Sequence, residues 1–342
     1  MSDPVLVEVL RGDRVESRHR GAIAVCDADG GVVFALGDVA APVYPRSAVK
    51  AFQALPMVES GAADRFGLDA AEIALACASH AGEPRHVETA RAMLEKCGRD
   101  VASLECGVHW PSSAEAARRL SARGESPTAL HNNCSGKHAG FLCLACAAGV
   151  APAGYVKRDH PVQREVKAAL EAMTGTRLGD GAIDGCAIPT YPVPLVALAR
   201  GFARFGTGRG LPPVRAAAAR RIREAVAAHP FFIAGDGRFD TVATEALGAR
   251  AFVKTGAEGV YGAAFPEHGL GVAIKCDDGA TRAAETAMAA VIGRFLSLNE
   301  SERARLGALF EPPIRNWNGE TVGHIRAAEA LTAGAAADDA GV

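Results

Sequence analysis

The sequence predicts an α+β fold in which antiparallel strands from both ends of the chain form one sheet, with helices packed against it. Three observations support this prediction. The first forty residues alternate between apolar and polar positions, the middle of the chain has helical periodicity, and short apolar runs return near the C-terminus. We expect a terminal helix on one face of the sheet and a large helical insertion, about residues 47–228, on the other.

The N-terminal segments VLVEVL and GAIAVCDADGGVVFALGD predict strands, with a tight turn at Asp-Gly-Gly. Helix starts follow in the middle of the chain, where Asp69 precedes Glu72 and Ser112 precedes Glu115 at the spacing of a capping box. The segment PRHVETARAMLEKCG predicts a helix that ends at a glycine. This part of the chain is therefore expected to be mostly helical.

The C-terminal segments ARAFVKTG, GVYGAAF and GLGVAIKCDDG predict three short strands, and ATRAAETAMAAVIGRFLSL predicts a long amphipathic helix. Because the strands at both ends enclose the helices, we expect a single domain over residues 1–330. Residues 331–342 contain little that a fold could bury, and we expect a disordered tail there.

Composition excludes several classes of partner. The formal net charge of the 342-residue chain is -2, too small to attract nucleic acid or an acidic membrane surface. The N-terminus has no long apolar run, so we expect neither a secretory signal nor a membrane span, and a cytoplasmic location. The nine cysteines are then expected to be thiols. Five of them lie in apolar stretches typical of a core: Cys26, Cys77, Cys143, Cys146 and Cys276.

The segment YPRSAVKAFQALP places Ser47 at the start of an apolar helix, with Lys50 three residues later. Ser47 could act as the N-cap of this helix or as a nucleophile. Positions i and i+3 share a helix face, so Lys50 could reach the Ser47 hydroxyl. The neighbours Val49, Phe52 and Leu55 are apolar, and burial lowers the pKa of an amine, which would let Lys50 accept a proton.

A second lysine lies in the tripeptide K-T-G, which begins at Lys254. Together, S-x-x-K and K-T-G are the signature of serine β-lactamases and penicillin-binding proteins, and they indicate a serine acyl-transfer site. A second serine normally bridges the two lysines within S-D-N, which is missing here. Ser79, in CASHAGEPRH, is the best substitute, although it could simply end a helix.

The segment HNNCSGKHAGF, followed much later by IDGCAIPTYP, brings together residue types that bind zinc. By spacing alone, Cys134, His138 and Cys186 form a weak metal pattern. The alternative is a loop broken by glycine that leads into a buried helix. Spacing leaves both interpretations open.

Taken together, six ordered segments between about Val5 and Phe295 resemble the rhizobial-type, or class 3, L-asparaginases, also called the asparaginase II family. They are YPRSAVKAFQALP, ACASHAGEPRH, LHNNCSGKHAGFL, DGCAIPTYPVPL, HPFFIAGDGRFDT and VKTGAEGVYGA. The resemblance implies a serine β-lactamase-like fold, hydrolysis of L-asparagine to aspartate and ammonia, and a homodimer. It leaves two alternatives: a β-lactamase or D-Ala-D-Ala peptidase relative, and a non-catalytic zinc-dependent metabolite-binding protein.

The resemblance also implies roles for individual residues. Two serine–lysine pairs would form the reaction centre: Ser47 with Lys50, and Ser79 with Lys254. A zinc ion would be bound by Cys134, Lys137 and Cys186. The substrate would be oriented by Arg46, His138 and Asp184.

Overall fold

The computed structural model describes residues 2–332. Its centre is an eight-stranded antiparallel sheet in the order β11-β12-β1-β2-β10-β9-β8, with β3 beside β2. The α+β class and the sheet built from both ends of the chain are confirmed, whereas the sequence did not predict β11 and β12. The strands are β1 (Val5–Arg11), β2 (Arg14–Asp27), β3 (Val32–Leu36), β8 (Phe252–Thr255), β9 (Val260–Phe265), β10 (Leu270–Cys276), β11 (Pro313–Arg315) and β12 (Thr321–Ala327).

The pairing of β2 with β10 joins the N-terminal and C-terminal strands. Successive side chains of a strand point to opposite faces. On β2, Ala24 and Cys26 therefore belong to the core shared with the helical layer, while Ile23 and Val25 belong to the second core. Helix α8 (Leu195–Thr207) covers the first face, and α12 (Thr281–Phe295), as predicted, covers the second, together with α13 (Glu300–Phe310) and α14 (Glu329–Thr332).

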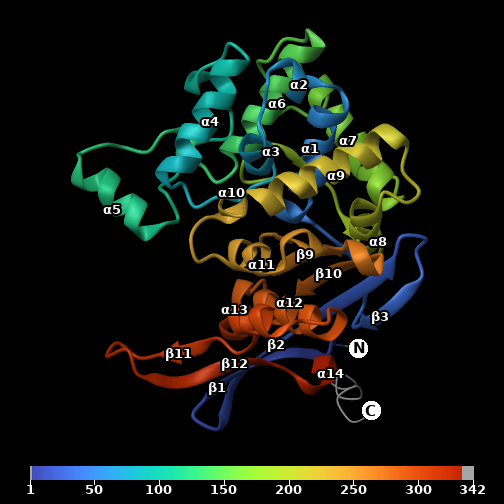
Figure 1. Cartoon of the computed structure of the whole chain (residues 1–342), viewed down its shortest axis with the longest axis vertical. Coiled ribbons are helices and arrows are strands. Elements are labelled where there is room, and N and C mark those ends of the chain that lie inside the picture. Colours follow the sequence, from blue (N-terminus) through green and yellow to red (C-terminus); the bar gives the residue numbers. More distant parts are fainter. Residues whose placement is uncertain (1, 333–342) are drawn as a thin grey trace.

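Figure 1 shows a helical layer above the sheet, formed by most of the chain between β3 and β8. Two short ribbons accompany it, β4 (Pro42–Val43) with β7 (Val193–Pro194) and β5 (Ala182–Ile183) with β6 (Pro189–Thr190). The helices are α1 (Lys50–Glu59), α2 (Ala62–Arg65), α3 (Ala70–Ala76), α4 (Pro84–Lys96), α5 (Ala114–Ala122), α6 (Ser135–Ala148), α7 (Pro161–Thr174), α8, α9 (Pro213–Ala228), α10 (Phe231–Ala234) and α11 (Phe239–Leu247). The last helix of this stretch, α11, instead packs against α13 in the second core.

The predicted helix starts are confirmed at one position and wrong at the other. Asp69 caps α3 in a full capping box with Glu72. Helix α5 is capped by Ser113, whose hydroxyl accepts the Ala116 N–H, so the prediction at Ser112 is wrong by one residue. Adjacent serines can each cap a helix, and the spacing to an acidic residue did not distinguish them.

The cysteines and the C-terminus complete the description. All nine cysteines are free thiols, and of the five expected in the core only Cys146 is half-buried. The predicted tail begins at residue 331, but Leu331 is fully buried at the end of α14. Residues 333–342 lie outside the described residues. No helix within residues 2–332 is long and apolar enough to cross a membrane.

Candidate active site

Ser79 lies between two lysine side chains at the junction of the helical layer and the sheet. Lys50 Nζ, from the first residue of α1, and Lys254 Nζ, from β8, each donate to Ser79 Oγ over 3.0 Å. The exposed fractions of Lys50, Ser79 and Lys254 are only 1%, 8% and 0%. The structure therefore brings three of the four predicted catalytic residues into one buried cluster.

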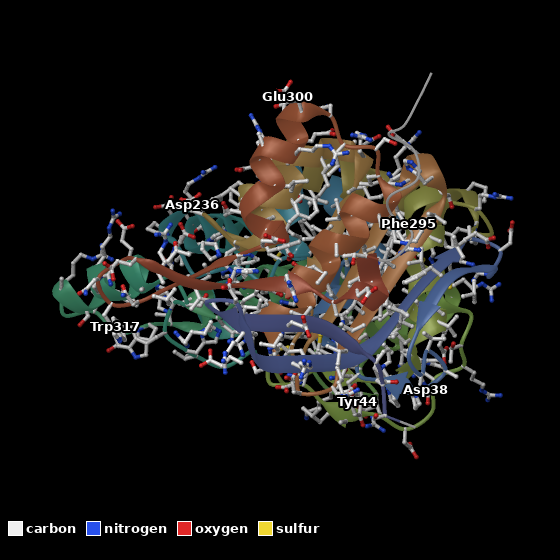
Figure 2. The ribbon with its side chains drawn as sticks, turned by 90° about the horizontal axis from the view of Figure 1, so that it is seen from below. Asp38, Tyr44, Asp236, Phe295, Glu300 and Trp317 are labelled. Carbon is white, nitrogen blue, oxygen red and sulfur yellow. The ribbon has the colours of Figure 1, made fainter. Side chains whose placement is uncertain are left out.

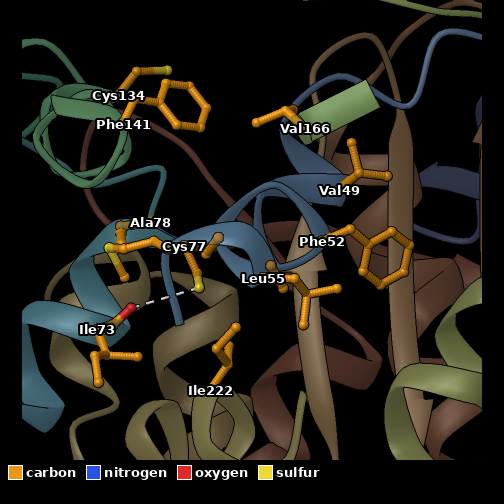
Figure 3. Packing of buried hydrophobic residues seen from close by; sticks show 14 of the residues in the cluster. Val49, Phe52, Leu55, Ile73, Cys77, Ala78, Cys134, Phe141, Val166 and Ile222 are labelled. Atoms are coloured by element: carbon orange, nitrogen blue, oxygen red, sulfur yellow. Dashed lines mark hydrogen bonds between the residues drawn. The ribbon is translucent and has the colours of Figure 1, made fainter. Parts of the chain in front are cut away.

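Helix α1 buries Lys50 because its neighbours are apolar. Figure 3 shows Val49, Phe52 and Leu55 in the hydrophobic cluster that also contains Cys77 and Ala78, the two residues before Ser79. A buried amine needs hydrogen-bond acceptors.

Lys50 Nζ finds two further acceptors in the backbone, the carbonyl oxygens of Ala78 at 2.6 Å and Asn133 at 3.4 Å. These two carbonyl oxygens and Ser79 Oγ are three acceptors that together fix the position of the amine.

Ser47 is half-buried in the 3-10 turn η1 (Arg46–Val49) and does not cap a helix. The N-cap positions of η1 and α1 are Pro45 and Val49, so the N-cap interpretation is wrong. Within the described residues, Lys50 Nζ makes its three hydrogen bonds elsewhere, and the predicted contact with Ser47 Oγ is not among them. The Ser47 hydroxyl is therefore left available to a ligand.

A close backbone contact nevertheless places Ser47 beside the Lys254 strand. A Cβ atom added to Gly256, the glycine of K-T-G, would lie 3.0 Å from Pro45 O and 2.9 Å from Val260 Cβ. Only glycine permits this approach of the end of β8 to the turn that carries Ser47. The turn itself holds Arg46 at a φ of 50°, an uncommon backbone conformation for a residue with a side chain.

Asp240, on α11, is a member of this site that the sequence analysis did not single out. It is 1% exposed, its Oδ2 lies 3.4 Å from Lys254 Nζ, and it also accepts hydrogen bonds from Thr255 N–H and the Tyr261 hydroxyl. Burial lowers the pKa of Lys254 to about 8, an effect that the Asp240 carboxylate opposes and the charge of Lys50 strengthens. One sequence feature pointed to Asp240: it is an acidic residue directly after Phe239 at the start of the mostly apolar segment FDTVATEAL.

The predicted zinc ligands also meet. Lys137 Nζ donates to Cys186 Sγ over 3.0 Å, and the Cys186 thiol also hydrogen-bonds to Cys134. Helix α6 starts here, pressed so closely against α3 that a Cβ on Gly136 would lie 2.4 Å from Leu75 O. The three side chains are 5% exposed or less.

The sulfur and amine groups of this second cluster shift one another's pKa values. The hydrogen bond from Cys186, with the charges of Lys137 and Lys50, holds the pKa of the Cys134 thiol well below its usual value against the effect of burial. Burial alone would lower the pKa of Lys137, but the neighbouring sulfurs, first that of Cys134 and then that of Cys186, raise it. Two sulfurs and an amine linked by these contacts form a donor set that suits zinc once the Lys137 amine gives up a proton to the metal's charge. Among residues 2–332, no group of three or more His, Cys, Asp or Glu side chains could hold a metal, so a site here needs the lysine.

The predicted substrate-orienting residues lie around these clusters. Arg46 Nη2 donates to Asp184 Oδ1 over 3.0 Å. Although burial raises the pKa of Asp184, the hydrogen bond from Arg46 and the charge of Lys137 lower it below its usual value. The guanidinium and carboxylate thus form an ion pair beside Ser47.

His138 presents an unpartnered donor. The Tyr155 hydroxyl accepts the Glu105 N–H over 2.9 Å, so its own proton goes to His138 Nδ1, 2.7 Å away. The proton of the imidazole is therefore on Nε2, which is buried without a hydrogen-bond partner among the described residues. An unpaired buried donor is costly, which indicates a site for an acceptor group of a ligand.

The fold and the site define an α+β protein whose buried serine–lysine cluster is typical of hydrolases that use an activated hydroxyl. The chain belongs to the L-asparaginase II family, whose model matches residues 7–327. No curated protein matches the chain.

Two solved structures are distantly similar. Mglu in its native form is 16% identical, with a TM-score of 0.35, over 79% of this chain and 62% of that chain. A β-lactamase (Mb2281c) from Mycobacterium bovis is 16% identical, with a TM-score of 0.36, over 85% of this chain and 95% of that chain. The chain thus spans less than two thirds of the length of Mglu.

Proposed function

We propose that the protein is an L-asparagine amidohydrolase that releases L-aspartate and ammonia through a serine acyl-enzyme. One observation carries the proposal within this family: two buried lysine amines converge on the Ser79 hydroxyl, next to the turn that presents Ser47. Proton transfer between groups fixed at this distance needs no rearrangement of side chains.

Ser47 is the nucleophile, because its hydroxyl is half-exposed and has no hydrogen-bond partner within residues 2–332, whereas Ser79 is buried between two amines. Lys50, three residues after Ser47, gives up one of its present hydrogen bonds and, as the neutral amine, takes the Ser47 proton while the oxygen attacks the side-chain carboxamide. The C–N bond of the tetrahedral intermediate breaks, and the departing nitrogen receives a proton through Ser79 and Lys254. Water then cleaves the Ser47 ester, releasing aspartate and restoring the hydroxyl.

The α-amino acid part of the substrate is oriented by charged groups near Ser47. The Arg46 guanidinium, one residue before Ser47, pairs with the α-carboxylate through its planar fork. The Asp184 carboxylate, which the Arg46 ion pair keeps charged, accepts from the α-ammonium. The free Nε2–H of His138 donates to a substrate oxygen.

Cys134, Lys137 and Cys186 would hold a zinc ion, since their three donor atoms already converge. When bound, the ion supplies positive charge that polarises a nearby oxygen. Without it, Lys137 pairs with the sulfurs as an ion pair, which accounts for a buried lysine there.

Ammonia release from purified protein tests this proposal. We expect release from L-asparagine in preference to L-glutamine, and no hydrolysis of a chromogenic β-lactam. Calorimetry measures asparagine binding on the same sample and, with the two activity assays, distinguishes the enzyme from the alternative functions. Binding of asparagine without ammonia would indicate a metabolite-binding protein, and β-lactam turnover would indicate a β-lactamase relative.

A further inference from the structure

Asp240, on α11, contacts Lys254 of the serine–lysine cluster and residues of two strands. Its Oδ2 accepts the Thr255 N–H over 3.0 Å and lies 3.4 Å from Lys254 Nζ. Its Oδ1 accepts from the Tyr261 hydroxyl on β9. Both carboxylate oxygens are thus held from different strands, and the carboxylate cannot rotate away from Lys254.

The contact with Thr255 also fixes the end of β8. This strand is the last of the sheet, so its outer backbone groups have no neighbouring strand. Asp240 supplies the missing acceptor at Thr255, the residue after Lys254. The same side chain therefore fixes the position of the backbone next to Lys254 and of the Lys254 amine.

Asp240 also supplies the negative charge of the cluster. Two buried lysines meet at Ser79, and ammonium groups in a dry site repel each other. Asp240 is the carboxylate in direct contact with Lys254. Without it, Lys254 would lose the attraction that favours its charged form.

We propose that Asp240 is a positioning residue for the second serine–lysine pair, holding Lys254 Nζ against Ser79 Oγ and providing the counter-charge that lets Lys254 carry a proton. The inference rests on the proposed function for its catalytic consequence, though its charge effect is measurable without a substrate. In the proposed mechanism, Lys254 must be protonated to deliver a proton toward the leaving nitrogen.

Several other charged groups surround the pair, and the charge of Asp240 acts on one of them besides Lys254. Lys50 on α1 and Arg238 just before α11 add positive charge near Lys254. Glu285 on α12 is repelled by the Asp240 carboxylate. Burial and the Asp240 carboxylate raise the pKa of Glu285 to about 7. The remaining neutral neighbours are Tyr261 and Cys77.

The test compares Asp240→Asn with Asp236→Asn, which makes the same chemical change four residues earlier at an exposed position (Figure 2). Unfolding free energy is measured from pH 6 to 10, together with the pH dependence of kcat. Removing an opposite charge at this distance lowers the pKa of Lys254 by about 1 to 3 units. In Asp240→Asn, the rise in stability linked to Lys254 deprotonation should therefore begin at a pH about 1 to 3 units lower than in the wild type. The loss of kcat at alkaline pH should move to lower pH by the same amount. Asp236→Asn should match the wild type in both measurements.

An unchanged stability curve in Asp240→Asn would overturn the inference, whatever the substrate. A stability rise that begins at lower pH, in a protein whose wild type releases no ammonia, would support the inference and overturn the proposed function; the change at Glu285 has the opposite sign, because deprotonation of that carboxyl lowers stability. If Asp240→Asn does not fold, Asp240→Glu decides: it keeps the charge but displaces it, so kcat should fall while the pH dependence stays. Wild-type kcat in Asp240→Glu would overturn the positioning role.

Discussion

Ser79 Oγ lies 3.0 Å from Lys50 Nζ and 3.0 Å from Lys254 Nζ, so one hydroxyl connects the two lysines. When both amines are charged, both donate to this oxygen. When one of them is neutral, it can accept the hydroxyl proton while the other donates, which makes Ser79 a relay between two amines. A relay is a different role from that of a nucleophile, which must face the substrate. The half-exposed Ser47 meets that second requirement.

The two serines should therefore respond differently to replacement by alanine. We expect Ser47→Ala to lower kcat by on the order of 10³-fold or more, because the bond-forming atom is lost. Ser79→Ala should lower kcat by on the order of 10²-fold, since it removes only proton transfer. Ammonia release gives both rates, and circular dichroism checks that both variants fold.

Intact-mass and peptide analysis of a trapped acyl-enzyme completes this comparison. The adduct should map to the peptide containing Ser47 and persist in Ser79→Ala. An adduct on Ser79 would assign the attack to that residue and give Ser47 an orienting role.

Lys254 should make stability depend on pH. Its pKa is about 8 in the folded protein because of burial, and about 10.4 when unfolded, so between these values the unfolded chain binds more protons. The free energy of unfolding should therefore rise from about pH 8 to about pH 10.4, by roughly 3 kcal/mol in total, while below pH 8 this group contributes no slope.

Lys254→Met provides the reference for this measurement, because other groups also titrate above pH 8. Urea unfolding at several pH values gives the free energy of unfolding of each protein. Subtracting the Lys254→Met values from the wild-type values isolates the contribution of Lys254. A flat difference would mean that the amine is not perturbed by burial.

Arg46 should control substrate affinity more than turnover. Arg46→Lys keeps the positive charge but loses the planar fork, so we expect KM for asparagine to rise by about 10-fold or more, with a smaller change in kcat. Arg123→Lys, at an exposed arginine paired with Glu125, is the matched control and should leave both constants unchanged. A fall in kcat alone would place Arg46 in the chemical step.

The sequence predicted which residues would meet at this site better than which atoms would touch. The motifs around Ser47, Ser79 and Lys254 mark residue types and an order along the chain, and the structure places all three at one junction. Helical spacing predicted that Lys50 would reach Ser47, but η1 is a 3-10 turn and the amine finds acceptors on Ala78 and Asn133 instead. Such competition between long-range acceptors is invisible in local spacing.

Elements defined by long-range contacts were likewise missed. Strands β11 and β12 have little alternation of their own and form because β12 pairs with β1, more than 300 residues away in sequence. Asp240 was overlooked for the same reason, since its importance depends on Thr255 and Tyr261 lying beside it. The Asp69 capping box, by contrast, is a contact between near neighbours and was predicted correctly.

Zinc content provides a test that does not depend on activity. The Cys134, Lys137 and Cys186 donors converge in a buried site, so we expect purified protein to carry about one zinc ion per chain. Cys186→Ser should lose the metal, because a hydroxyl is a much poorer ligand than a thiolate. Cys146→Ser, a half-buried cysteine near the opposite end of α6, should keep it. Elemental analysis measures the metal in all three proteins.

Chelation should also lower the melting temperature of the wild type and of Cys146→Ser, since zinc that binds only the folded state stabilises it. The melting temperature of Cys186→Ser should stay unchanged. Wild-type protein without zinc, or Cys186→Ser with a full complement, would show that Lys137 and the two sulfurs form a structural ion pair and nothing more.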